Sequence, residues 1–333
     1  MTRVDRIKAF ASVGSHLSSM GEEEFDAIVD KARNDNPWFT PGSIACALNS
    51  IKNLLSSEEL TRWLQSYPEP RQLRKIALVM AGNIPLVGFH DLLCVLISGH
   101  TAVVKLSSKD RYLVSYIIEK LLNIEPGFSS RIIVAEQLKG FDAVIATGSD
   151  NSARYFDYYF GKYPHIIRRN RTSVAVITGD ESSEEFFELG KDVFTYFGLG
   201  CRNVAKLYVP RQYSFTALLD VWSSYQDIIN HHKYCNNYDY QKSILLVNRD
   251  NFLDNGFVLL KQSEALVSPI SVVYFEEYTS SNDLQEKIGK AQEKIQVIVG
   301  RGPVGEIAFG SAQTPGLSDY ADKVDTMKFL TAF

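Results

Sequence analysis

The sequence predicts an α/β protein with two doubly wound domains, built on parallel or mostly parallel sheets and preceded by a helical lead-in. Three observations carry this prediction. From residue 74 onward, short apolar runs that end in a turn alternate with helical stretches. The first 73 residues contain only helical, partly amphipathic patterns. The chain has 333 residues, a length that fits roughly two domains.

The composition is that of a globular protein able to bury large cores. Hydrophobic residues make up 45% of the chain and charged residues 22%, which excludes a disordered protein. With 35 basic and 39 acidic residues the net charge is −4, so the charge balance indicates neither nucleic acid nor an anionic membrane as a partner. The most apolar region, residues 76–104, is interrupted by Pro85 and several polar side chains, so we expect no membrane span.

The cysteines and histidines indicate no metal site. The four cysteines are scattered without a CxxC pair, which favours neither zinc nor a disulfide framework. His231 and His232 are adjacent, so on a helix they would point to different faces. The N-terminus has no apolar core of the signal-peptide type, and we therefore expect a cytoplasmic protein.

Three helices are predicted in the lead-in. The helix after Ser19 has carboxylates in its first turn and basic residues near its end. Pro41 begins a second helix, and Ser56 begins a third with a capping-box pattern. None of the three carries a motif that indicates chemistry.

The alternation of strands and helices begins with the apolar run KIALVMAG, which predicts a buried strand at residues 75–82. The other strands predicted in the first half are residues 101–107, 131–136 and 141–146, and the helices are residues 89–97, 110–123 and one from about 151. In the second half the predicted strands are residues 174–177, 204–209, 242–248, 268–275 and 296–299, and a helix is predicted at residues 183–196. A boundary near residue 172 separates the halves.

The stretch Gly198-Leu199-Gly200-Cys201 is the first candidate for chemistry. Its two glycines allow a sharp bend and the close approach of a ligand. A cysteine at such a turn lies near backbone N–H groups, which favour the thiolate and can also bind an oxyanion. The alternative is a small buried thiol beside a tight turn.

Two polar residues lie at the carboxyl ends of predicted strands, Asn83 just after one and Lys105 at the end of another, where parallel sheets bind ligands. Asn83 could donate a hydrogen bond to a developing oxyanion, or it could be an ordinary turn asparagine. Lys105 suits a ribose hydroxyl or a phosphate, or it could simply extend its amine into water from the strand end.

Two further stretches could bind anions. Thr147-Gly148-Ser149 lies between a strand and a helix, where helix N-terminal amides would suit a pyrophosphate. The cluster Arg168–Arg171 could contact the phosphates of a nucleotide or of CoA, or it could be a solvated surface. The phosphate-binding pattern GxxxxGK[ST] does not occur in the chain.

Taken in order from about residue 75, these stretches resemble the aldehyde dehydrogenase superfamily, and more closely its acyl-CoA reductase branch, which includes the LuxC-like fatty-acid reductases of bacterial luminescence. GNIPLVGF resembles the segment of the oxyanion asparagine, here Asn83. TAVVKLSS resembles the strand of the ribose-binding lysine, here Lys105, and ATGSD the pyrophosphate-facing turn, here Gly148 and Ser149. FGLGCRNVAKLYV resembles the nucleophile segment, here Cys201, and FGSAQTPGLSDY, from Phe309, resembles the glycine-rich closing segment.

The resemblance implies an aldehyde-dehydrogenase-like fold and a reaction. Residues 1–172, with the lead-in 1–73, would be the dinucleotide-binding domain rejoined by residues 314–333, and residues 173–313 would be the catalytic domain. The reaction would be the NADPH-dependent reduction of an acyl-CoA or acyl-protein thioester to an aldehyde through an acyl-enzyme. The residues that would act are Cys201 as nucleophile, Asn83 as oxyanion donor, and Lys105, Ser107, Ser108, Thr147, Gly148 and Ser149 as cofactor ligands.

Three departures from the superfamily refine this expectation. Residues 167–171 stand where a general-base glutamate activates water, and they contain no carboxylate. Its absence fits an acyl-enzyme that exchanges with a thiol, which ionises more easily than water. Ser108 replaces a carboxylate that would repel a 2′-phosphate, and Lys109 and Arg111 follow it, so we expect NADPH, with NADH as the alternative. The usual ribose-binding glutamate aligns with Ala265, so that role stays unassigned.

Two other functions fit the same residues. One is an aldehyde dehydrogenase acting in the oxidising direction, which would need a water-activating base. The other is a non-redox acyl carrier, acyltransferase or scaffold subunit that loads an acyl group onto Cys201. The resemblance also suggests a homo-oligomer and, as a partner, an acyl-protein synthetase or an acyl transferase.

Overall fold

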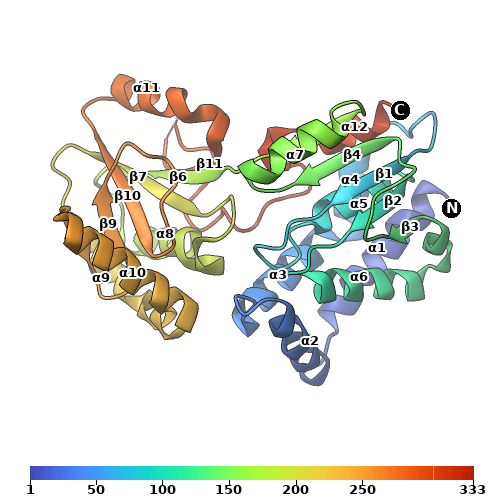
Figure 1. The fold of residues 1–333 in the computed structure, drawn as a ribbon, viewed down its shortest axis with the longest axis horizontal. Coiled ribbons are helices and arrows are strands. Elements are labelled where there is room, and N and C mark those ends of the chain that lie inside the picture. The colour runs from blue at the N-terminus through green and yellow to red at the C-terminus, as the bar shows by residue number, and fades with distance from the viewer. Residues whose placement is uncertain (303) are drawn as a thin grey trace. The chain divides into compact units, whose positions relative to one another are not determined.

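The computed structural model describes residues 1–302 and 304–333, and in it the chain folds into two compact units. Unit 1 consists of residues 1–170 and 315–333, and unit 2 of residues 171–314. Each unit is a parallel or mostly parallel sheet covered by helices, as predicted (Figure 1).

Unit 1 begins with the four helices of the lead-in and then alternates strands with helices. Its helices are α1 (Arg3–Ser18), α2 (Glu22–Asp35), α3 (Pro41–Leu54), α4 (Ser57–Leu64), α5 (Phe89–Ile97), α6 (Arg111–Ile124), α7 (Asp150–Phe160) and α12 (Thr326–Thr331). Its strands are β1 (Lys75–Val79), β2 (Thr101–Lys105), β3 (Ile132–Val134), β4 (Ala143–Thr147) and β5 (His165–Arg168). The sequence analysis predicted every one of these strands except β5.

The sheet of unit 1 has the strand order β3-β2-β1-β4-β5, and all its neighbours are parallel. The order reverses at β1, whose two neighbours are β2 and β4. In an open parallel sheet, the crevice beyond the carboxyl ends of the strands at this reversal is where ligands bind.

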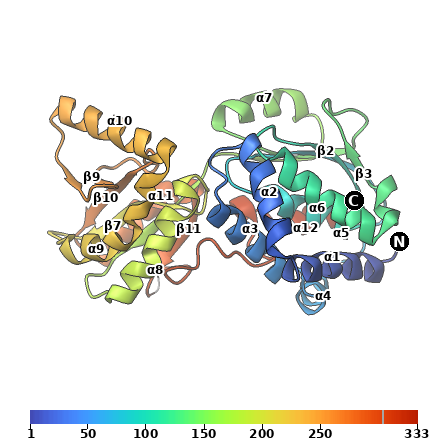
Figure 2. The same ribbon diagram turned by 90° about the horizontal axis from the view of Figure 1, so that it is seen from below.

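Alternate residues of β1 face opposite sides of the sheet. Ile76 and Leu78 belong to the large core formed with α1, α5 and α6, whereas Ala77 packs in a second core with Phe156 and Phe160 of α7. Figure 2 shows α7 on one side of this sheet and α1 and α6 on the other. Both faces are therefore buried, which explains why the strand is a continuous apolar run.

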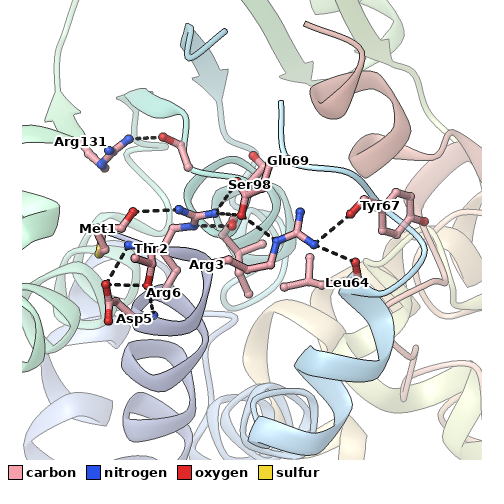
Figure 3. A network of polar contacts seen from close by, with 12 residues as sticks. Met1, Thr2, Arg3, Asp5, Arg6, Leu64, Tyr67, Glu69, Ser98 and Arg131 are labelled. Carbon is pink, nitrogen blue, oxygen red and sulfur yellow. Dashed lines mark hydrogen bonds and ion pairs between the residues drawn. The ribbon is translucent and has the colours of Figure 1, made fainter. Parts of the chain in front are cut away.

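The lead-in is attached to the sheet domain by a buried cation. Arg6 of α1 donates through Nε to the carbonyl of Ile97 (2.7 Å) and through Nη2 to both carboxylate oxygens of Glu69 (2.8 and 2.9 Å). Figure 3 shows this network, in which Arg3 reaches the same carboxylate. A buried charge is tolerated when it is paired in this way.

The C-terminal segment of unit 1 is held by a second buried arginine. Arg168 of β5 is 3% exposed and lies 2.6 Å from Asp91. It also donates to the hydroxyl of Thr326 and to the carbonyl of Ala321, both at 2.9 Å. Arg168, the first arginine of the cluster at residues 168–171, is therefore a buried residue with a structural role. Its neighbour Arg169 forms an exposed ion pair with Asp157.

Unit 2 contains a larger sheet with the strand order β11-β6-β7-β10-β9-β8, parallel except for β8 against β9. Its strands are β6 (Thr172–Val176), β7 (Val204–Pro210), β8 (Phe252–Asp254), β9 (Leu259–Gln262), β10 (Val272–Tyr278) and β11 (Ile295–Gly300). Its helices are α8 (Ser183–Phe194), α9 (Thr216–Trp222), α10 (His232–Asn248) and α11 (Ser281–Ala291). Figure 1 shows α8 and α11 on opposite faces of this sheet.

One predicted strand of unit 2 is wrong. Residues 242–248 form the last two turns of α10, and the strands β8 and β9 that follow were not predicted. Tyr234, Tyr238 and Leu245 are buried on one side of this helix, whereas Leu246 and Val247 are exposed. A short apolar run cannot be assigned to helix or strand by periodicity alone, and the buried face became recognisable only over the whole of α10.

Candidate active site

Three predicted residues of unit 1 lie at or just after the carboxyl ends of adjacent strands, at the same edge of the sheet. Asn83 lies in the loop after β1, Lys105 ends β2, and Thr147 ends β4. Val79 is paired with Lys105 on one side and with Ala146 on the other, so these strand ends are in register. A small cavity at this reversal of strand order is lined by Val79, Ala81, Gly88, Asp91 and Thr147, among others.

The loop that carries Asn83 forms hydrogen bonds with two buried polar side chains, while Asn83 itself is exposed. Asn36 donates from its amide to the carbonyl of Gly82 (3.1 Å), and the backbone N–H of Leu86 donates to the carboxyl group of Asp110 (2.7 Å). Leu86 has φ +57°, a left-handed conformation that costs energy for a side chain of this size. The loop is therefore a defined structure that depends on two buried polar partners.

The loop after β2 packs closely against the loop after β1. A Cβ atom built on Gly82 would lie 2.5 Å from the hydroxyl oxygen of Ser107, so only glycine allows this approach. The same hydroxyl accepts the backbone N–H of Lys109 (3.2 Å), and Ser108 is exposed. Arg111, which we expected near a 2′-phosphate, forms an ion pair with Glu136 (2.8 Å). Lys109 is exposed and remains a candidate for that role.

The turn after β4 meets the requirements of an anion site at a helix start. Ser149 is the N-cap of α7 and accepts the backbone N–H of Ser152 (3.3 Å). A Cβ atom on Gly148 would lie 2.8 Å from both Phe156 and Ser152, so glycine is needed at this position. Backbone N–H groups and the helix dipole favour an anion at such an end. These residues fit the pyrophosphate of a dinucleotide.

Asp110 is a buried carboxyl group beneath these loops that the sequence analysis did not identify. Its side chain is 1% exposed, and burial raises its pKa to about 8. The negative charge of Asp35 adds to the rise, and the hydrogen bond from Leu86 opposes it. Among the described residues, no hydrogen-bond partner lies within reach of its second oxygen, Oδ1. The group is therefore neutral over most of the range below about pH 8.

In unit 2, Cys201 lies just after a left-handed turn that connects α8 with β7. Tyr196, Phe197 and Gly198 have φ values of +54°, +59° and +77°. Glycine adopts this conformation readily, but two aromatic residues in succession do so only when the surroundings hold them there. The sequence indicated a bend at the glycines and gave no signal that it begins two residues earlier.

The peptide groups beside Cys201 have defined orientations. The backbone N–H of Asn203 donates to the carbonyl of Gly200 (3.1 Å), and the hydroxyl of Ser173 donates to the carbonyl of Cys201 (3.0 Å). No described peptide bond is cis, and in a planar trans peptide the N–H points opposite to the C=O. The N–H of Cys201 therefore points away from Asn203. The Cys201 residue is half-buried.

The glycine-rich segment after β11 is attached to the end of α8. The buried carboxylate of Asp192 accepts the backbone N–H groups of Gly310 (2.7 Å) and Ala312 (2.9 Å). Burial raises the pKa of Asp192 to about 6, although these two hydrogen bonds oppose the rise. This anchor was not predicted, because it joins residues more than a hundred positions apart.

The protein is similar to known proteins in structure, but its sequence has no significant similarity to a family model or a curated protein. Solved structures of aldehyde dehydrogenases match over most of the chain. In residues 1–302 and 304–333, no helix is both long and apolar enough to cross a membrane, and the side chains that the structure describes include no cluster of acidic, histidine or cysteine groups that could hold a metal.

Three of the solved structures illustrate the match. Aldehyde dehydrogenase 21 from Physcomitrella patens, in complex with succinate, has a TM-score of 0.68 and 12% identity, over 99% of this chain and 84% of the other. A putative aldehyde dehydrogenase from Burkholderia cenocepacia has a TM-score of 0.67 and 11% identity, over 91% and 75%. Betaine aldehyde dehydrogenase from Staphylococcus aureus, in complex with NAD+, has a TM-score of 0.66 and 12% identity, over 92% and 71%. The chain has the aldehyde dehydrogenase fold, as predicted.

Proposed function

We propose that the protein is an NADPH-dependent reductase that converts an acyl-CoA or acyl-protein thioester into an aldehyde, with Cys201 as the nucleophile. The observation that carries this proposal is the geometry of the Cys201 turn. The hydrogen bond from the backbone N–H of Asn203 to the carbonyl of Gly200 directs the N–H of Cys201 away from Asn203, and this fixed orientation supports its role as an oxyanion donor.

In the first half of the proposed reaction the Cys201 thiolate attacks the thioester carbonyl carbon. The N–H of Cys201 is assigned as a hydrogen-bond donor to the tetrahedral oxyanion, and the sequence resemblance implies the amide of Asn83 as a second donor. The C–S bond to the leaving thiol then breaks, and the acyl group remains on Cys201 as a new thioester. Residues 167–171 provide no carboxylate to activate water, which disfavours hydrolysis of this acyl-enzyme.

The cofactor is assigned to the edge of the sheet in unit 1. Gly148 and the N-terminus of α7 would take its pyrophosphate, while Lys105, Ser107, Ser108 and Thr147 would surround the rest of the adenosine half. Bound NADPH would supply the hydride, and solvent the proton, that convert the acyl-enzyme thioester into a thiohemiacetal. Cleavage of its C–S bond would then release the aldehyde and return the Cys201 thiol. The solved structures of similar fold include complexes with NAD+, which supports a nicotinamide cofactor.

The test is NADPH consumption by the purified protein with acyl-CoAs of increasing chain length, with the aldehyde trapped. Cys201→Ala should abolish both acylation and reduction and leave NADPH binding intact, because the cofactor is assigned to unit 1. Cys235→Ala is the matched control, since Cys235 is another half-buried thiol of unit 2. Retained acylation in Cys201→Ala would refute the nucleophile. Acylation of Cys201 without NADPH consumption would favour an acyl carrier instead.

A further inference from the structure

The side chain of Asn203 is buried between the end of α8 and the Cys201 turn, and it is 2% exposed. Its Oδ1 accepts the backbone N–H of Gly200 (2.8 Å). Its Nδ2 lies within hydrogen-bond distance of three carbonyl oxygens, those of Asp192 (3.1 Å), Val193 (3.2 Å) and Thr195 (2.7 Å). One amide group therefore connects the last turn of a helix with the residue that precedes the nucleophile.

These contacts supply hydrogen-bond partners to the end of α8 and also stabilise the turn that follows it. The last carbonyl groups of a helix have no partner within the helix, and Asn203 supplies one for Asp192 and Val193. The turn that follows contains left-handed residues of large side chain, Tyr196 and Phe197, which persist only when their surroundings determine them. The donor and acceptor of a primary amide match this arrangement, whereas a carboxylate would offer no donor to the carbonyls.

A second polar side chain fixes the other side of Cys201. Ser173 of β6 donates to the carbonyl of Cys201, and the backbone N–H of Ser173 donates to the carbonyl of Asn203 (3.1 Å). The peptide groups before and after Cys201 are thus both oriented by residues that do not belong to the turn 195–202. The direction of the Cys201 N–H and the position of the thiol depend on these bonds together.

From this network we infer that Asn203 and Ser173 are positioning residues for Cys201, which set the orientation of its thiol and of its backbone N–H. This inference deepens the proposed function and rests on it only for the reduction step. Reactivity of the thiol can be measured without any acyl substrate, so the two proposals can fail separately.

The experiment compares Asn203→Asp and Ser173→Ala with the wild-type protein. Asn203→Asp keeps the shape of the side chain and the oxygen that accepts the N–H of Gly200. It removes the N–H donors to the three carbonyl oxygens at the end of α8. Asn255→Asp is the matched control, because Asn255 lies in the same unit and its amide donates to the carbonyl of Leu219 (3.0 Å), remote in sequence from Cys201. Two quantities are measured, namely the pH profile of Cys201 alkylation by iodoacetamide, followed by mass spectrometry, and the rate of acyl-CoA reduction. A melting curve shows that every variant is folded at the assay temperature.

For Asn203→Asp we expect a shifted alkylation profile and a loss of about 10²-fold in reduction rate, the size of effect that misplacement by about 1 Å causes. Ser173→Ala should shift the pH profile of Cys201 alkylation by less than Asn203→Asp does. NADPH binding should not change in either variant. If Asn203→Asp does not fold, Ser173→Ala alone decides, since it removes a single hydroxyl group.

Alkylation profiles equal to those of the wild type and of Asn255→Asp would overturn the inference, even if the melting temperature falls, because a merely structural role would lower stability alone. Shifted profiles in a protein whose wild type reduces no acyl-CoA would support the inference and refute the proposed reductase.

Discussion

The carboxyl group of Asp110 accepts the backbone N–H of Leu86 at 2.7 Å, and this bond holds the loop on which Asn83 lies. The two residues are 24 positions apart, and they connect the loop after β1 with the start of α6. Because Leu86 is left-handed, the bond compensates for a strained backbone at the same residue.

The first prediction concerns the pH dependence of stability. Burial raises the pKa of Asp110 from 3.8 to about 8, so the folded state binds its proton more tightly than the unfolded state. The free energy of unfolding should therefore fall, on account of this group, as the pH rises from about 4 to about 8. Asp110→Asn keeps an acceptor for Leu86 without a charge, and its stability relative to wild type should increase over that interval by an amount on the order of a few kcal/mol. Urea unfolding at several pH values measures the difference.

Asp26→Asn is the control for Asp110→Asn, since it removes the same charge from an exposed position of α2. A difference between Asp110→Asn and wild type that is independent of pH would contradict the assigned environment of Asp110.

Asp192→Asn should destabilise the glycine-rich segment of unit 2. Asp192 accepts two backbone N–H groups, and an asparagine would turn a donor toward either Gly310 or Ala312. Leaving one buried donor without a partner costs about 1–3 kcal/mol. Hydrogen exchange at residues 309–312 should accelerate, while exchange in the exposed control Asp220→Asn should not. Unchanged protection of Gly310 and Ala312 would show that other contacts hold the segment.

Arg168→Met should loosen the C-terminal segment of unit 1. It removes the partner of Asp91 and the donors to Ala321 and Thr326, and breaking a buried ion pair costs about 3–5 kcal/mol. The neighbouring Arg169→Met breaks only an exposed ion pair with Asp157, which is worth about 0–1 kcal/mol. Chemical unfolding and limited proteolysis near residue 320 compare the two variants. Equal effects would contradict the structural role of Arg168.

Asn83→Ala tests the proposed oxyanion donor. Removal of one such donor lowers the rate constant of the chemical step by about 10²–10³-fold, and NADPH binding should be retained because Asn83 does not touch the adenosine half in the proposal. Asn53→Ala, at an exposed position of α3, is the control. A rate close to that of wild type would remove Asn83 from the mechanism.

Ser108→Glu tests the cofactor preference. Ser108 is exposed in the loop after β2, where a carboxylate would repel a 2′-phosphate. The variant should lose affinity for NADPH by about tenfold or more, equivalent to about 1.4 kcal/mol, and should retain its affinity for NADH. Ser129→Glu adds the same charge at an exposed position before β3 and should change neither affinity. Equal loss for both cofactors would indicate that Ser108 does not face the 2′ position.

Local patterns in the sequence determined most of the fold and the choice of candidate residues. The helix at residues 89–97 was predicted with the bounds that α5 has, because its apolar residues and the following glycine are neighbours in the chain. The strands around β1, β2, β4 and β7 were recognisable for the same reason. Gly198 before Cys201 likewise marks a turn through its own backbone freedom, with φ +77°, and Gly148 marks a close approach of the chain to α7.

The tertiary structure alone decided how these turns are held. Residues 242–248 are part of a helix because α10 buries one face against β9 and β10. Asp110, Asp192, Arg168 and Asn203 have partners that no spacing rule predicts, because hydrogen bonds across a fold depend on which segments meet. A buried polar group is stable only with such a partner, so the roles of these side chains emerge once the chain has folded around them.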